Sequence, residues 1–328
     1  MRNIHLIYII GIALCITACA KKRPKEPSAG RPYEVFVTST TGDTAAIAMV
    51  CKTLSVEVEA LPQPEPQFDA VKMELADYQS AIKKKSTVLI DINRKKYHSP
   101  TVTWQTSDGT IHIFLNADSN ESLANAIDSI GNIMREQLLR HEIAAAKDLL
   151  KTKHNPKAEQ KVKDVTGVEM LIPADMQHSK QGEQFIWLSN DALTGMQSIC
   201  VYSYPGLTLN AERALAMRDS VLGRNIEGET KDMHMTTAAQ SVISQMMTNS
   251  GRKVLVQRGL WEMTGDAMGG PFVSRSYVDS VNHRIVVKEA FVYAPERKKR
   301  NLIRQLEAAI MELGVLCKQS APTGRARS

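Results

Sequence analysis

The chain has few cysteines, and their positions argue against two common kinds of site. Only five occur in 328 residues, and no two of them have C-x-x-C spacing. Thiol redox centres and zinc ribbons depend on such pairs, so the sequence supports neither. Cys15 and Cys19 lie in the N-terminal apolar segment. The other three are an odd number, so whether any two of them pair in an oxidising compartment stays open; they are Cys51, Cys200 and Cys317.

The common catalytic and cofactor motifs are also missing. The sequence has no H-E-x-x-H, G-x-S-x-G, G-x-G-x-x-G or G-x-x-x-x-G-K-[ST], and no carboxylate pair stands out for glycoside hydrolysis. Met233, His234 and Met235 are soft ligands, but adjacent residues of an extended chain point to opposite faces. We therefore predict no metal and no cofactor. A catalytic triad is defined by geometry rather than order, so an enzyme whose groups meet only in space stays open.

The N-terminus carries a bacterial lipoprotein signal. Arg2 precedes an apolar core over residues 4–14, and Ile16-Thr17-Ala18-Cys19 fits the lipobox, with small residues before the cysteine. The core is shorter than the ~20 residues of a membrane-spanning helix. We predict a signal peptide at residues 1–18 and a lipid, such as palmitate, on Cys19. The alternatives are a secreted protein cleaved after Ala18, or a short membrane anchor.

The residues after Cys19 predict where the protein lies. Residues 19–32 are polar and contain three prolines, which is typical of a disordered tether. Ala20 is not the inner-membrane retention aspartate of some bacteria, and residues 21–25 are mainly basic rather than the acidic signal for surface export. We expect a lipid-anchored outer-membrane protein that faces the periplasm. Export makes nucleic acid an improbable partner. The internal basic runs at 83–85, 94–96 and 297–300 are interpreted as solvated surface.

The hydrophobic periodicity predicts an α+β fold with two sub-domains, at residues 33–165 and 166–317, followed by a disordered tail at 318–328. Each contains an antiparallel or mixed sheet covered by a long amphipathic helix that follows a hairpin. In the first, a hairpin at 101–116 precedes a helix over about 120–152, with a polar extension to about 164. In the second, strands at 271–279 and 284–293 precede a helix over about 296–316.

Three further expectations concern local structure. The prolines of residues 61–69 predict an extended crossover rather than regular structure, and a partner-binding proline motif is the alternative. His112 alternates with Ile111 and Ile113, which predicts a solvent-facing side chain. Further strands are expected at 168–172, 184–189, 197–204 and 252–263, and a helix at about 209–222.

The glycine-rich segment 258–272 is the best candidate binding loop. Gly269 and Gly270 permit a close backbone approach, and exposed amides there would hold an anion beside a stacking tryptophan. The alternative is a β-turn or bulge with Trp261 in the core and Asp266 bonded to the turn backbone. The candidate residues are Arg258, Trp261, Glu262, Asp266, Gly269 and Gly270.

Several stretches carry a family resemblance. They are SAGRPYEV at 28–35, LPQPEPQFD at 61–69, FIWLS at 185–189, RGLWEMTGDAMGGPFVS at 258–274, and FVYAP with IRQLEA within 291–308. In their order and spacing the mature chain resembles the bacterial outer-membrane lipoprotein family catalogued as domain of unknown function 4837. The resemblance implies a lipid-anchored envelope protein. It implies no activity and transfers no catalytic residue.

The sequence thus favours a non-catalytic binding or scaffold module of the cell envelope. Its expected partners are the membrane, through the lipid, and an envelope protein or glycan. The first alternative is an envelope hydrolase with a site near residues 258–272, where Arg258, Glu262 and Asp266 are the first candidates. A weaker alternative is a carrier of a lipid or glycan, which needs a long apolar cavity.

Overall fold

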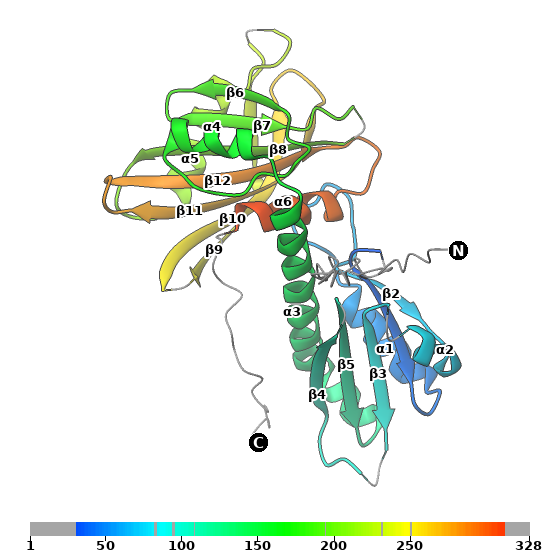
Figure 1. Ribbon diagram of the computed structural model, residues 1–328. Helices are drawn as coiled ribbons and strands as arrows, with labels where there is room; N and C mark the ends of the chain where they lie inside the picture. The colour runs from blue at the N-terminus through cyan, green and yellow to red at the C-terminus, as the bar shows by residue number, and fades with distance from the viewer. Residues whose placement is uncertain are drawn as a thin grey trace, which may run out of the picture.

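The computed structural model describes residues 31–81, 84–93, 96–107, 109–193, 195–230, 232–249 and 251–311. The predicted signal peptide, the lipid site at Cys19, tether residues 19–30, Cys317 and the tail at 318–328 lie outside the described residues. The chain forms two α+β domains, each with its own sheet, joined by one long helix (Figure 1). The predicted fold class is confirmed. No helix in the described ranges is long and apolar enough to cross a membrane.

The first domain has a five-stranded mixed sheet in the order β2-β1-β3-β5-β4. Strands β2, β1, β3 and β5 are parallel to their neighbours, whereas β4 pairs antiparallel with β5 as the predicted hairpin. The apolar run TVLIDI forms the central strand, as a segment buried between neighbours requires. The strands are β1 (Glu34–Ser39), β2 (Asp69–Lys72), β3 (Thr87–Ile92), β4 (Thr101–Ser107) and β5 (Thr110–Ala117).

Helices α1 (Thr44–Leu54) and α3 (Asn120–Thr152) cover one face of this sheet and contact each other. Asp43 caps α1 by accepting a hydrogen bond from the Ala46 amide, and Ser119 caps α3 in the same way. Their apolar stripes close a core with alternate residues of β1, β3 and β5. The short α2 (Leu75–Ala81) lies beside β1.

Helix α3 leads from the first domain to the second (Figure 1). It ends at Thr152, where the polypeptide leaves the helical conformation. The predicted extension to 164 is a separate helix, α4 (Pro156–Thr166), because Asn155 caps a new start and proline takes its first position. Gly167 ends α4 in the left-handed conformation, with φ 69°. Helix α4 packs on β7 and β8 of the second domain, although the sequence analysis assigned it to the first sub-domain.

The second domain has a seven-stranded antiparallel sheet in the order β6-β7-β8-β12-β11-β10-β9. Helices α4 and α6 (Arg300–Ile310) cover one face and α5 (Ala211–Asn225) the other, so both faces are filled by buried side chains. The strands are β6 (His178–Gly182), β7 (Phe185–Ser189), β8 (Met196–Pro205), β9 (Met235–Asn249), β10 (Arg252–Met263), β11 (Gly269–Asp279) and β12 (Arg284–Tyr293).

Three local predictions for this domain were wrong or incomplete. Residues 168–172 form no strand, because the hydrogen bonds of this segment go to the α3–α4 connection, as from the Asn155 amide to the Ile172 carbonyl. Strand β9 was not predicted, because its first half is mostly polar and the apolar residues of its second half, Ile243, Met246 and Met247, are exposed rather than on a core face. Helix α6 begins at Arg300 rather than at about 296.

The prediction that His112 faces solvent was also wrong: it is only 2% exposed. Thr110 Oγ1 donates to the Ser107 carbonyl, so it accepts from His112 Nε2 at 2.9 Å. The other ring nitrogen, Nδ1, then accepts from Thr87 Oγ1 at 2.9 Å. The neutral imidazole therefore links two buried threonines, which is why a histidine sits among isoleucines on a central strand.

We expect the free energy of unfolding to fall as the pH drops below about 6.5, the ordinary histidine value. Burial, and to a lesser extent the nearby charge of His141, lowers the pKa of His112 in the folded protein. The unfolded chain therefore binds a proton first, and stability is lost from about pH 6.5 down towards the lower folded pKa. Urea unfolding of wild type and His112→Gln at pH 7.5, 6.5 and 5.5 measures this. The exposed His98→Gln is the control and should keep the wild-type pH dependence. If the unfolding free energy of His112→Gln changed with pH as steeply as that of the wild type, His112 would not be the cause of the pH dependence.

Candidate functional site

The two domains meet where the proline-rich crossover of the first domain reaches helix α6 of the second. The Glu65 carboxylate, buried at this contact, accepts hydrogen bonds from the Lys299 amide at 2.6 Å and the Arg300 amide at 3.1 Å. Lys299, the residue preceding α6, makes no side-chain cap. A carboxylate from one domain thus satisfies the unpaired amides and positive end of a helix in the other.

Two arginines of α6 extend this contact. Arg300 donates to Asp69 at 2.7 Å and to the Pro66 carbonyl at 2.6 Å. The Arg304 guanidinium lies 4.8 Å from the ring centre of Tyr33 and donates to the Gln67 carbonyl at 3.1 Å. Burial lowers the pKa of Arg304 and raises that of Tyr33. These contacts fix the relative position of the domains through α6.

Arg258, one of the predicted binding residues, belongs to the same junction. It lies on β10 and pairs with Glu307 of α6. Burial favours a higher pKa for Glu307, but the charge and hydrogen bond of Arg258 outweigh it and lower the pKa overall. The pair is buried on the Glu307 side and about a third exposed on the Arg258 side. Arg258 is therefore held by a carboxylate of its own chain.

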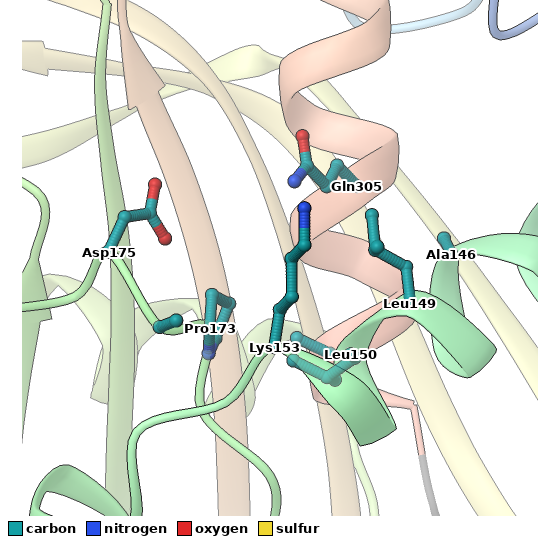
Figure 2. A pocket seen from close by; sticks show the side chains of 9 residues that line it. Ala146, Leu149, Leu150, Lys153, Pro173, Asp175 and Gln305 are labelled. Atoms are coloured by element: carbon teal, nitrogen blue, oxygen red, sulfur yellow. The ribbon is translucent and has the colours of Figure 1, made fainter. Parts of the chain in front are cut away.

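A pocket of about 280 Å³ opens at this junction, between the end of α3, residues 173–175 and α6 (Figure 2). Most of its lining is apolar. The Lys153 side chain extends towards Gln305, and the Asp175 carboxylate lies across the opening (Figure 2). The lining residues are Ala146, Leu149, Leu150, Lys153, Pro173, Ala174, Asp175, Gln305 and Ala309.

The wall of this pocket is fixed by backbone pairing between two connections. His154 and Pro173 form an antiparallel bridge, and the Ala174 amide donates to the Lys153 carbonyl at 3.3 Å. Asn190 donates to Asp175 at 3.4 Å. Lys153 and Asp175 therefore stand on neighbouring, tied segments, while Gln305 comes from α6 on the far side. The pocket exists only when both domains are in place.

The chemistry of the pocket suits binding. Its nine lining residues supply one ammonium group, one carboxylate and one amide over an apolar floor, and none supplies a hydroxyl, thiol or imidazole side chain. An apolar cavity with a few convergent polar groups at a domain boundary is the usual form of a ligand site. Elsewhere, no group of three His, Cys, Asp or Glu side chains in the described ranges has a geometry to hold a metal.

The structure gives Trp261, Gly269 and Gly270 packing roles. Trp261 is 2% exposed, and its indole nitrogen donates to the Val292 carbonyl at 3.2 Å across β11. A Cβ at Gly270 would lie 2.0 Å from that same carbonyl oxygen, and one at Gly269 2.8 Å from the Trp261 carbonyl. The glycines leave room for the indole and the neighbouring backbone.

The other candidates of the loop do not meet. Asp266 is exposed and accepts a hydrogen bond from the Ala267 amide within its own turn. Glu262 is exposed near the end of β10, while Arg258 pairs with α6. Trp261 packs in the core beneath α5, on the opposite face of the sheet from Arg258 and α6. The candidate residues therefore do not form one site around the loop.

Cys51 and Cys200 are free thiols.

Sequence reasoning missed the residues that build the junction. The basic run 297–300 was interpreted as solvated, yet Lys299 and Arg300 are buried against the crossover. The proline-rich crossover was predicted to lack regular structure, and residues 61–68 form no helix or strand, only bends and an isolated bridge at Pro66. The one feature of the sequence that could have indicated the junction is Glu65, a carboxylate between Pro64 and Pro66. No sequence pattern indicated the polar residues of the pocket, because Lys153, Asp175 and Gln305 are single polar residues far apart in the chain.

Comparison with known proteins divides the chain where the structure does. Residues 155–312 match the family model described as Domain of unknown function (DUF4837), and residues 28–151 match that described as Domain of unknown function (DUF8532). The resemblance to the first family therefore covers the second domain and does not extend over the whole mature chain. No curated protein and no solved structure matched significantly. The two family models thus match the two domains separately, and each covers less than half of the chain.

Proposed function

We propose that the protein is a lipid-anchored binding module of the cell envelope, and that the junction pocket is its binding site. The observation that carries the proposal is the pocket itself: an apolar floor with Lys153, Asp175 and Gln305 at its opening, built jointly by two domains. An ammonium and a carboxylate on tied segments recognise a polar ligand that also carries an aliphatic group, such as a peptide segment of an envelope protein.

The alternatives have less support in the geometry. A hydrolase near residues 258–272 would need Arg258, Glu262 and Asp266 to converge, and their contacts lead to different elements. A lipid carrier would need a long apolar cavity between sheet and helices. In the described part of the second domain, packed side chains fill the space on both sheet faces.

Anchoring at Cys19 supplies the rest of the proposal. The lipobox, the basic residues that follow it and the polar tether to residue 30 support a position of the folded domains beside a bilayer, on its periplasmic side. We propose attachment to the outer membrane, because Ala20 is not a retention aspartate and residues 21–25 are mainly basic. Binding at the junction would then bring a partner to the membrane surface.

Site-specific photocrosslinking in intact cells tests the binding role. A photoreactive residue at Gln305 should capture one discrete envelope component, and Lys153→Glu should reduce that adduct at least tenfold by reversing the charge at the opening. The control position is Val281, 84% exposed in the β11–β12 turn. The same adduct from Val281, or an adduct from Gln305 that ignores Lys153→Glu, would contradict a site at the junction.

Mass spectrometry of the purified chain from the same cells reports on the anchor. The proposal requires an N-terminal residue 19 that carries acyl groups. An intact leader, or an unmodified chain in the soluble fraction, would overturn the envelope assignment while leaving the crosslinking result to be judged separately.

A further inference from the structure

The first domain contains a second cavity, of about 460 Å³, that the proposed binding role does not use. It lies between β1, the end of β2, helix α2 and the turn before β3. The Phe36 ring forms part of its lining, with Lys85 Nζ 4.0 Å from the ring centre. Lys72 and Lys84 also line it, so the lining contains three lysines beside one aromatic ring.

The charges of this cavity favour an anion. Two carboxylates, Glu74 and Asp77, stand against the three lysines. Glu74 pairs with Lys72 at 3.1 Å, but both side chains are more than half exposed. Exposed ion pairs of this kind contribute little to stability. Lys72 can therefore leave Glu74 for an anion that binds it more tightly. A phosphodiester offers more acceptor oxygens than a single carboxylate.

The position of the cavity in the chain indicates where the anion comes from. Phe36 lies five residues after Arg31, where the described chain begins. Residues 20–30 separate Arg31 from the proposed lipid site at Cys19, and a chain of this length spans at most about 40 Å. An anchored first domain would therefore start within about 40 Å of the bilayer, with β1 the first strand after the tether.

We propose that the cavity at Phe36 binds the phosphate of an anionic membrane lipid and so turns the β1–α2 side of the first domain towards the bilayer. Lys72, Lys84 and Lys85 hold the headgroup, and the Phe36 ring keeps Lys85 in place. The proposal rests on the envelope anchor proposed above. Docking this side fixes the orientation of the second domain, because the junction at α6 couples the two domains.

Vesicle binding by the full mature chain tests the inference. Cys19→Ser removes the acyl site, so that binding depends on the protein surface alone. The vesicles contain phosphatidylcholine with or without phosphatidylglycerol. The variant Lys72→Gln/Lys84→Gln/Lys85→Gln should lower the partition coefficient for anionic vesicles about a hundredfold. The matched control is Lys157→Gln/Lys161→Gln/Lys253→Gln, which removes the same charge from exposed positions of the second domain and should change binding less than threefold.

Three outcomes would overturn the proposal. They are equal losses in both variants, unchanged binding in both, and full displacement by millimolar inorganic phosphate, which would make a free anion the ligand. Lys84→Glu alone, at an exposed position, keeps the test valid if the triple variant unfolds, and should lower binding at least tenfold. Failure of the anchor is separable, because acylation of residue 19 is measured independently by mass spectrometry.

Discussion

Replacing Arg218 by methionine is expected to lower the free energy of unfolding by about 3–5 kcal/mol. Arg218 on α5 and Glu289 on β12 form an ion pair that is almost completely buried, with Nη2 of the arginine 2.8 Å from the carboxylate. Arg218 also donates to Thr237 at 2.6 Å and stacks 3.9 Å from the ring centre of Phe272. Without the arginine, a buried carboxylate is left with no counter-charge.

The pH dependence identifies the cause of this loss. Burial already raises the pKa of Glu289, although Arg218 opposes the rise. Without Arg218 the folded-state pKa should rise further above the unfolded value, so the destabilisation should shrink as the pH falls towards 5. Urea unfolding at pH 7.5 and pH 5 measures it. Arg218→Met/Glu289→Leu should recover much of the loss, and an equal loss in single and double variants would show that packing, rather than charge, is responsible.

A surface ion pair provides the matched control. Arg140 and Glu136 pair at 2.5 Å on α3, and both side chains are more than half exposed. Arg140→Met should therefore change the unfolding free energy by less than about 1 kcal/mol. If it cost as much as Arg218→Met, burial would not be what separates the two pairs.

Replacing Gly270 by alanine is expected to cost about 3 kcal/mol or more. The added Cβ would lie 2.0 Å from the Val292 carbonyl oxygen and 3.2 Å from the Trp261 indole nitrogen. The obstacle is backbone of a central strand, which cannot rotate aside as a side chain can. The alanine would either push β11 away from β12 or break the bond from Trp261 to Val292.

Thermal unfolding together with tryptophan fluorescence measures this effect, because Trp261 loses its hydrogen bond and packing. Gly195→Ala is the control: its Cβ would meet only side-chain ends, 3.3 Å from Arg297 and 3.7 Å from Leu302, so a change within about 0.5 kcal/mol is expected. A stable Gly270→Ala protein with native fluorescence would contradict the packing role and return Gly270 to the candidates for ligand binding.

The packing roles of Trp261 and Gly270 explain why the sequence of segment 258–272 looked like that of a binding loop. A tryptophan, four glycines and charged residues in 15 positions resemble a ligand site. In the folded protein the same residue types solve packing problems: the glycines let an indole reach the backbone of β12, and Arg258 neutralises Glu307 on α6. Glycine signals a close approach, but sequence does not say whether the approaching group is a ligand or the chain itself.

The sequence by itself determined what depends on neighbours in the chain. The periodicity of α3 and the β11–β12 hairpin could be predicted, because turns and amphipathic faces are set within a few residues. Only the tertiary structure decided the rest. Glu65 meets the Lys299 amide across 234 positions, and the pocket joins Lys153 to Gln305. Such contacts depend on how the two domains pack around α6, and no local sequence pattern predicts that packing.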